Sequence, residues 1–225
     1  MPNSALPPVI AIDGPSASGK GTVAQRVAQA LHFHYLDSGA LYRLCALAAQ
    51  REGISLDDET ALARLANDLN IRFTREQIFL SEQDVSDAVR SEACGANASH
   101  IAVFPSLRAA LLQKQRDFRR LPGLVCDGRD MGSIVFPDAP LKVYLTATTD
   151  SRAERRTKQL IEKGMYAKIQ DVINDLKSRD ARDSARPVAP LKHFPDARLL
   201  DTTALSIDEA VSQVVEWYRE TTRKN

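Results

Sequence analysis

The sequence between residues 9 and 22, VIAIDGPSASGKGT, decides the fold. Its first part, Val9 to Ile12, is short, apolar and β-branched, which is typical of a buried parallel strand. The strand leads into a turn at Asp13-Gly14-Pro15. From Gly19 to Leu31 apolar residues recur every four positions, so we expect a helix with one face packed on a sheet. The order of strand, glycine-rich loop and helix predicts an α/β fold.

The glycine-rich loop matches the pattern G-x-x-x-x-G-K and is followed by Gly and Thr. Its residues are Gly14, Pro15, Ser16, Ala17, Ser18, Gly19, Lys20, Gly21 and Thr22. In such a loop the backbone N–H groups and the helix N-terminus favour phosphate oxygens, and the lysine places a charge on the β- and γ-phosphates. We therefore predict a nucleoside triphosphate site with Lys20 as a catalytic residue. The alternative is a tight turn whose lysine merely faces solvent.

The residue after Lys20 is Gly21, where the general motif has a Ser or Thr that binds Mg²⁺. Mg²⁺ retains several waters in many nucleotide sites. Its ligands are therefore open at this stage: phosphates and water, Thr22, or a carboxylate such as Asp127. A second possible role of Asp127 is to stabilise the loop by hydrogen bonds.

Composition limits the classes of partner. The 225 residues carry 30 basic and 29 acidic side chains, a net charge of +1, which provides no overall field for nucleic acid or a membrane surface. The three cysteines lack metal-ligand spacing, and the N-terminus has no apolar signal region. We expect a cytoplasmic protein with reduced thiols, which binds neither nucleic acid nor membranes.

Further short apolar segments, Leu124–Cys126, Val143–Leu145 and Leu199–Leu200, alternate with helical segments. This alternation predicts a parallel sheet flanked by helices, within a single domain over residues 1–225. The last helix begins with a capping box of Ser206 and Glu209. Its expected buried stripe consists of Ile207, Ala210, Val211, Val214, Val215 and Tyr218.

Two stretches interrupt the alternation. Residues 57–97 contain a helical pattern and then an expected hairpin of Ile71–Phe73 with Ile78–Leu80, so we expect an insert outside the main sheet. Residues 150–186 are rich in arginine and poor in aromatic residues, which favours a mobile lid.

The lid carries its charges at helical spacing. Arg179, Asp183 and Arg186 stand at i, i+4 and i+7, and Arg152, Arg155 and Arg156 share a face of the preceding helix. Arginine suits bidentate contacts with phosphate. The alternative is a solvated helix with charge pairs.

Two motifs suggest a second ligand. LDSGALYR, residues 36–43, lies where a strand should end and a helix begin, so the helix start, Ser38 and Arg43 could hold a monophosphate. The alternative is that Ser38 is only an N-cap and Arg43 a solvated residue.

DGRD, residues 127–130, follows an apolar strand and places Arg129 and Asp130 at the carboxyl end of a sheet, where α/β folds bind ligands.

A phosphate-binding loop also occurs in nucleotide-dependent switches. A switch that binds GTP needs D-x-x-G and N-K-x-D, and the sequence contains neither. A kinase is therefore the better interpretation.

The chain resembles the bacterial cytidylate kinases, which belong to the nucleoside monophosphate kinases. The resemblance runs through IDGPSASGKGT, LDSGALYR, ANASHIAVFPSLRAALLQKQR, DGRDMGSIVFPDAP and RDARDSAR. It implies a P-loop kinase fold with a monophosphate-binding insert and an arginine-rich lid, ATP and Mg²⁺ as cofactors, and CMP or dCMP as acceptor. It also implies acceptor-binding residues: Ser38, Arg43 and Arg129 near the phosphate, Ser99, Arg108 and Asp130 near cytosine, and Arg179, Asp183 and Arg186 near the sugar and phosphates.

Phosphoryl transfer mainly requires positioning and positive charge. We expect Lys20, Arg155, Arg156 and Arg179 to supply that charge, and the acceptor phosphate to attack without a covalent intermediate on the protein. The protein is expected to act as a monomer. The alternative acceptors are UMP, AMP and shikimate.

Overall fold

The computed structural model describes residues 6–74, 77–162 and 164–223. The chain divides into two compact units, the first formed by Met1–Leu36 with Phe118–Asn225 and the second by Asp37–Asp117. Each unit has its own sheet and helices.

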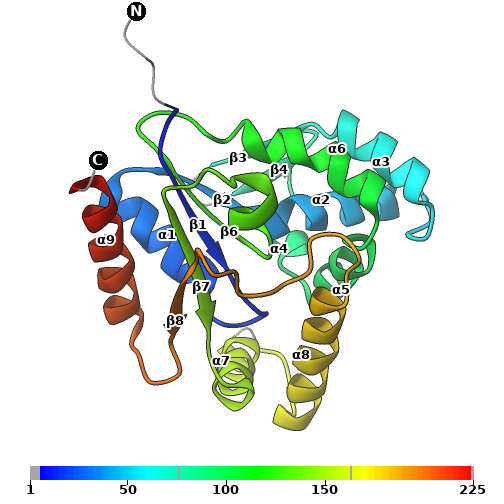
Figure 1. Cartoon of the computed structure of the whole chain (residues 1–225). Coiled ribbons are helices and arrows are strands. Elements are labelled where there is room, and N and C mark those ends of the chain that lie inside the picture. The colour runs from blue at the N-terminus through cyan, green and yellow to red at the C-terminus, as the bar shows by residue number, and fades with distance from the viewer. Residues whose placement is uncertain (1–5, 75–76, 163, 224–225) are drawn as a thin grey trace, which may run out of the picture. The chain divides into compact units, whose positions relative to one another are not determined.

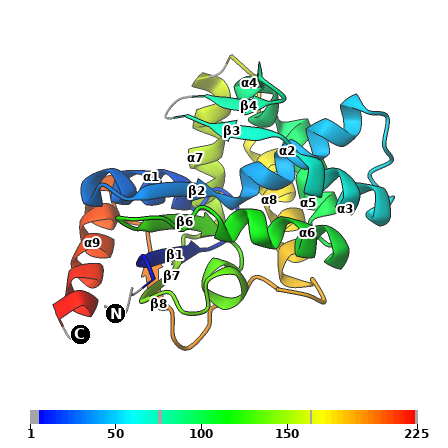
Figure 2. The same cartoon turned by 90° about the horizontal axis from the view of Figure 1, so that it is seen from above.

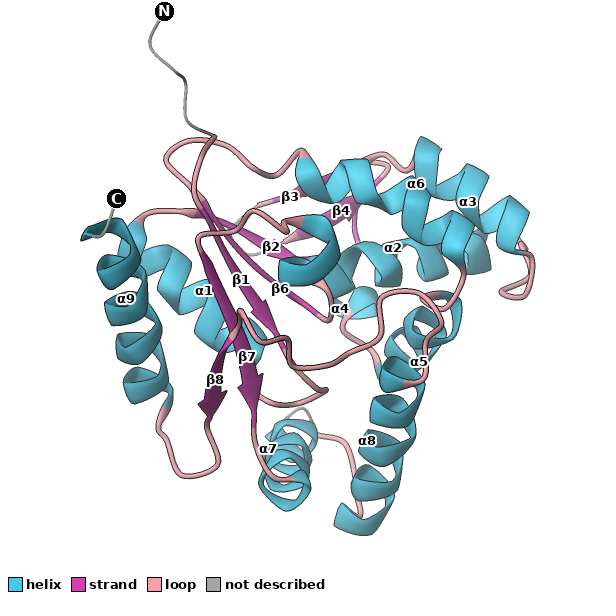
Figure 3. Ribbon diagram, viewed as in Figure 1, coloured by secondary structure: helices cyan, strands magenta, loops and turns pink. Residues whose placement is uncertain are grey.

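The first unit is built on a five-stranded sheet, drawn in magenta in Figure 3. Its order is β2 (His34–Asp37), β6 (Leu124–Gly128), β1 (Val9–Asp13), β7 (Leu141–Thr146) and β8 (Arg198–Asp201). The pairs of β1 with β6, β1 with β7 and β7 with β8 are parallel. The expected parallel α/β sheet is therefore confirmed, with the glycine loop after its central strand.

Apolar side chains fix the position of α1 (Lys20–Leu31) and α9 (Ile207–Arg223) against this sheet. The two helices lie side by side in Figure 1. Val27 and Val214 are fully buried in the core that they share with Ile10. The capping box is confirmed, because Ser206 Oγ accepts the N–H of Glu209 at 3.3 Å and Glu209 Oε2 accepts the N–H of Ser206 at 2.8 Å. Ile207 was wrongly placed in the buried stripe, since it is exposed at the first turn.

Three further helices of the first unit follow the strands. A π-helix, η1 (Met131–Val135), comes after β6, and α7 (Thr149–Glu162) and α8 (Ile169–Ser184) come between β7 and β8. The last two pack together through a small apolar cluster of Ala153, Leu160, Val172 and Leu176. The small size of this cluster agrees with the sparse apolar content of residues 150–186.

The second unit contains helices and a small antiparallel sheet. The helices are α2 (Ser38–Arg51), α3 (Glu59–Asp68), α4 (Ser86–Val89), α5 (Glu92–Ile101) and α6 (Pro105–Arg116). The strands are β3 (Ile71–Phe73), β4 (Ile78–Leu80) and β5 (Gln83–Asp84), and β3 and β4 lie side by side in Figure 2. Their register, Ile71 with Leu80 and Phe73 with Ile78, confirms the predicted hairpin. The predicted insert, residues 57–97, lies within this unit.

The three cysteines, Cys45, Cys94 and Cys126, are buried free thiols, as the sequence predicted. Burial raises the pKa of the Cys45 thiol to about 12 and also raises the pKa of Cys94 and Cys126. These thiols are therefore poor nucleophiles near neutral pH.

Across the described part of the chain, none of the helices combines the length and the apolar character that crossing a bilayer would require.

Candidate active site

The glycine loop connects β1 to α1 in a conformation that depends on its glycines. Gly19 has φ of 90° and forms the N-cap of α1, a left-handed conformation that other residues adopt at a cost. A Cβ on Gly14 would lie 2.0 Å from the carbonyl oxygen of Leu145 on β7, so only glycine fits there. Lys20 Nζ donates to the carbonyl oxygen of Pro15 at 3.3 Å and thus lies over the loop. This geometry favours the phosphate-binding interpretation over a lysine that only faces solvent.

Arginines of α7 reach the same loop. Arg152 Nη1 donates to the carbonyl oxygen of Ser16 at 3.0 Å, and Arg155 Nη1 lies 3.4 Å from that of Ser18. Arg155 also donates to Thr202 Oγ1 at 3.1 Å. Arg152 and Arg155 therefore share one face of α7, as expected. Arg156 is oriented differently, with Nη1 donating to Gln159 of its own helix at 3.2 Å.

Carboxylates of α8 meet the loop and the end of β6. Asp183 Oδ2 accepts from Arg129 Nε at 2.6 Å, Asp183 Oδ1 accepts from Arg186 Nη2, and Arg129 Nη2 donates to Ser16 Oγ at 2.9 Å. Burial alone would raise the pKa of Asp183, but the charges of Arg129 and Arg186 hold it below its usual value. These residues therefore form one charged, largely buried cluster.

Asp180 is a second α8 carboxylate at the loop, and the sequence analysis did not identify it. Its Oδ1 accepts the N–H of Ser16 at 3.2 Å, and its Oδ2 accepts from Arg152 Nη1 at 2.6 Å. The available signal was its place in RDARD, three residues before Asp183. Arg179, its neighbour, is half-buried on α8.

Asp127 lies on β6 beside the start of α1. Tyr35 Oη donates to its Oδ1 at 2.7 Å, and a Cβ built on Gly21 would lie 3.8 Å from its Oδ2. A side chain at position 21 would therefore lie in van der Waals contact with this buried carboxylate. The described residues contain no group of three or more His, Cys, Asp or Glu side chains arranged to hold a metal ion.

Ser38 and Arg43 belong to α2 in the second unit. Asp37, not Ser38, caps the helix, since its carboxylate accepts the N–H of Ala40 at 3.1 Å, and Ser38 is buried in the first turn. Arg43 is not a solvated residue, because its Nη1 donates to the carbonyl oxygens of Val89 at 2.8 Å and Ser91 at 3.3 Å. Both alternatives considered for this motif are therefore wrong.

Ser99 on α5 and Arg108 on α6 are both buried polar residues of the second unit. Arg108 Nη1 donates to the carbonyl oxygen of Ala102 at 3.2 Å, and its guanidinium carbon lies 5.8 Å from the ring centroid of Tyr42 on α2. The structure thus brings Arg108 next to the helix that carries Ser38 and Arg43.

The family model and the curated relatives indicate the same family. A model of the cytidylate kinase family matches residues 10–220. The chain is 60% identical over 213 residues to a cytidylate kinase of Chromobacterium violaceum, covering 95% of this chain and 96% of that protein. It is 58% identical over 210 residues to one of Cupriavidus necator, covering 93% and 95%.

Among solved structures, the chain is similar to a gluconokinase from Sinorhizobium meliloti, with a TM-score of 0.51 and 15% sequence identity. The match covers 97% of this chain and 95% of the other. At this identity the likeness concerns the fold.

Proposed function

Because the chain belongs to the cytidylate kinase family, we propose that it transfers the γ-phosphoryl group of ATP to CMP and to dCMP. The observation that carries this proposal is the family match over residues 10–220, which includes the glycine loop and the acceptor motifs. It favours CMP over the alternative acceptors UMP, AMP and shikimate, and a kinase over a nucleotide switch.

The glycine loop is the donor site in this proposal. Its N–H groups and the start of α1 hold the β- and γ-phosphates, and Lys20 neutralises charge that grows in the transition state. Arg155 supports this site, since it already contacts the loop carbonyl of Ser18. We assign Arg156 and Arg179 the same kind of role toward the transferring group.

We assign acceptor-binding roles to residues of each unit separately. In the first unit, Arg129 is assigned to the acceptor phosphate, Asp130 to cytosine, and Asp183 and Arg186 to the sugar and phosphates. In the second unit, Ser38 and Arg43 are assigned to the phosphate, and Ser99 and Arg108 to the base. These assignments rest on the family match, and Ser38, Ser99, Arg108 and Asp130 are all buried polar residues.

In the reaction an oxygen of the CMP phosphate attacks the γ-phosphorus. A bond forms between them, the bond from the γ-phosphorus to the β,γ-bridging oxygen breaks, and ADP leaves with that electron pair. The chain's own residues hold the two nucleotides in line and exclude water.

Asp127 is the residue that would hold Mg²⁺ at the donor site. One buried carboxylate beside the phosphate loop, with water and phosphate oxygens as other ligands, is a common arrangement for this ion. When bound, Mg²⁺ supplies positive charge to the β- and γ-phosphates. The hydrogen bond from Tyr35 to Oδ1 restricts the rotation of the Asp127 carboxylate.

We also propose a cytoplasmic monomer in which residues 150–186 act as a lid. The free thiols suit a reducing compartment. Arg152, Arg155 and Asp180 contact the glycine loop, so ATP bound at the loop would change the surroundings of the lid.

A coupled assay of ADP formation with CMP, dCMP, UMP, AMP and shikimate tests the function. We expect CMP and dCMP to give kcat/KM at least tenfold above the others, since a good base contact provides about 1–3 kcal/mol of discrimination. Equal or better turnover with another acceptor contradicts the proposal.

A further inference from the structure

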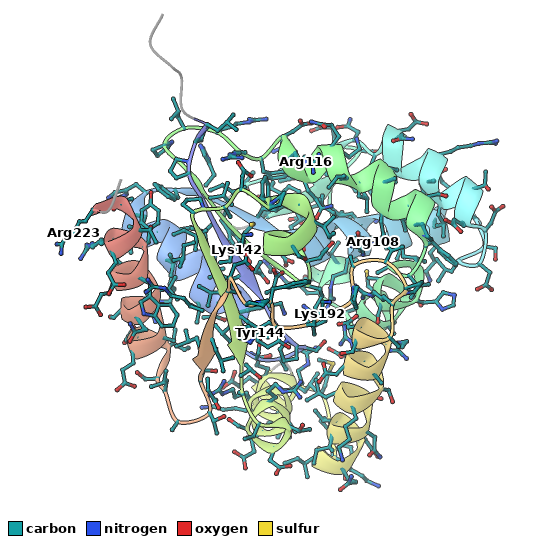
Figure 4. All side chains as sticks on the ribbon, in the orientation of Figure 1. Arg108, Arg116, Lys142, Tyr144, Lys192 and Arg223 are labelled. Atoms are coloured by element: carbon teal, nitrogen blue, oxygen red, sulfur yellow. The ribbon has the colours of Figure 1, made fainter. Side chains whose placement is uncertain are left out.

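Asp13, the last residue of β1, has a carboxylate that binds the segment following β6. Its Oδ1 accepts the N–H of Met131 at 2.8 Å, and its Oδ2 accepts the N–H of Gly132 at 2.9 Å. In the sheet Asp13 is the register partner of Gly128 on β6 and of Tyr144 on β7, which Figure 4 labels. Because each oxygen holds a different N–H group, the carboxylate fixes both the position and the orientation of this segment.

The segment needs such an acceptor. η1 begins at Met131, and the side chain of Asp130 does not cap it. The first N–H groups of a helix have no partner inside the helix. Asp13 supplies that partner from 118 residues away.

The peptide group between Asp130 and Met131 is held at both ends. Its N–H donates to Asp13, and its carbonyl oxygen accepts the N–H groups of Ile134 at 2.9 Å and Val135 at 3.2 Å. These hydrogen bonds fix the plane of the peptide group, and so they restrict the direction in which the Asp130 side chain leaves the backbone. On the other side of Asp130, the Arg129 guanidinium is held by Asp183 and Ser16.

We propose that Asp13 is a positioning residue for the acceptor base, which sets the direction of Asp130 and thereby the discrimination between CMP and UMP. This inference rests on the proposed contact of Asp130 with cytosine. A carboxylate suits the task better than a neutral amide, since an asparagine offers one oxygen and would turn an NH₂ group toward one of the two N–H donors.

The proximity of Asp130 gives a second reason to assign this role. Partial burial raises the pKa of Asp13 to about 6 against the lowering effect of the N–H groups of Gly132 and Met131. The Asp130 charge contributes to this raised pKa, and the Arg129 charge opposes it. The fold therefore places two carboxylates near each other, an arrangement with an electrostatic cost that a passive turn would not require.

The test compares Asp13→Asn with wild type, using CMP and UMP as acceptors. We expect kcat/KM for CMP to fall about tenfold, mainly through KM, because a bond to a charged group is lost. The values for UMP and the KM for ATP should change less than about threefold. Asp58→Asn is the matched control, since Asp58 accepts the N–H of Ala61 at 2.9 Å at the start of α3. It should leave the preference for CMP unchanged.

A double-mutant cycle with Asp130→Ala identifies what Asp13 acts through. If Asp13 acts through Asp130, the double variant should prefer CMP no less than Asp130→Ala alone, so the effects are not additive. Additive losses overturn the inference. Should Asp13→Asn not fold, Asp13→Glu takes its place, because it displaces the carboxylate by one methylene and carries the same expectation.

The cycle also separates two failures. If Asp130→Ala lowers the preference for CMP while folded Asp13→Asn retains it, the positioning role of Asp13 is refuted and the base contact stands. If Asp130→Ala itself retains the wild-type preference, the proposed base contact is refuted, and the inference with it.

Discussion

At the scale of single residues, Lys20 is the side chain that should separate phosphate transfer from folding. It is not part of the apolar core, and its amino group lies on the loop carbonyl of Pro15. We predict that Lys20→Ala remains folded but loses about 100-fold or more in kcat, since removing one donor of transition-state charge costs this order.

Steady-state kinetics with CMP, together with circular dichroism, measure this effect. Lys177→Ala, which changes an exposed lysine of α8, is the control and should retain full turnover. Near wild-type turnover in folded Lys20→Ala would show that the glycine loop is not the donor site.

Asp130 carries the prediction on base specificity. Cytosine has a 4-amino donor beside the N3 acceptor, whereas uracil has a carbonyl oxygen beside an N3–H donor, so a carboxylate accepts from the first and repels the second. We predict that Asp130→Ala lowers kcat/KM for CMP about tenfold and changes UMP much less. Both acceptors are measured with the same enzyme preparation, and an unchanged ratio would direct attention to Ser99 and Arg108.

The raised pKa of Asp13 predicts its titration. Carbon NMR of the side-chain carboxyl should show a midpoint near pH 6, assigned by its absence in Asp13→Asn. Since the folded protein holds this proton more tightly than the unfolded chain, the contribution of Asp13 to the free energy of unfolding decreases as pH rises from about 4 to 6. A midpoint near pH 4 would show that the surroundings of Asp13 do not disfavour its charge.

At the scale of elements, an ion pair between Asp183 on α8 and Arg129, which follows β6, joins these two elements. The Asp183 carboxylate joins two arginines that are themselves largely buried, Arg129 and Arg186. We predict that Asp183→Ala lowers the free energy of unfolding by about 3–5 kcal/mol, because the arginines lose their buried counter-charge. Urea denaturation measures the loss, and Asp175→Ala, an exposed position on the same helix, should lie close to wild type.

The depressed pKa of Asp183 gives that contribution a pH dependence. A group whose pKa is lower in the folded state stabilises above its unfolded pKa, and the stabilisation is lost as pH falls through the folded value. The difference between wild type and Asp183→Ala should therefore shrink in acid. A difference independent of pH would indicate packing rather than charge.

The α7 and α8 pair carries the prediction on lid motion. The apolar cluster between these helices is small, and their polar side chains contact the glycine loop. The stability of α7 and α8 should therefore depend on whether a nucleotide is bound at the loop. Hydrogen exchange over residues 150–186 should slow when ATP and CMP bind together. Equal exchange with and without nucleotides, combined with normal activity of Arg179→Ala, would refute a working lid.

At the scale of the whole molecule, the sequence predicted elements whose signals are local. Apolar patterns located β1, α1 and the hairpin of β3 with β4, because burial on one face leaves a regular pattern, and the capping box located the start of α9. The expected end of a strand in LDSGALYR placed Ser38 at the start of a helix.

Contacts that depend on the tertiary fold were not predictable in this way. Asp13 and Met131 are 118 residues apart, and Asp180 lies 164 residues from Ser16, so no spacing rule joins them. η1 was missed as well, since a five-residue π-helix has no periodic pattern of its own. Ser99 and Arg108 were named by resemblance alone, whereas Ser38, Arg43, Arg129 and Asp130 were also expected from motifs at the ends of strands.

The burial of Cys45, Cys94 and Cys126 has a practical consequence for spectroscopy. Thiol reagents attack exposed thiolates, so a maleimide dye should react slowly with the natural chain. A cysteine introduced in place of Tyr166, which is 87% exposed between α7 and α8, would be the preferred target for such a dye. Fluorescence from that one label could then report on the lid in single molecules, without removal of the natural thiols.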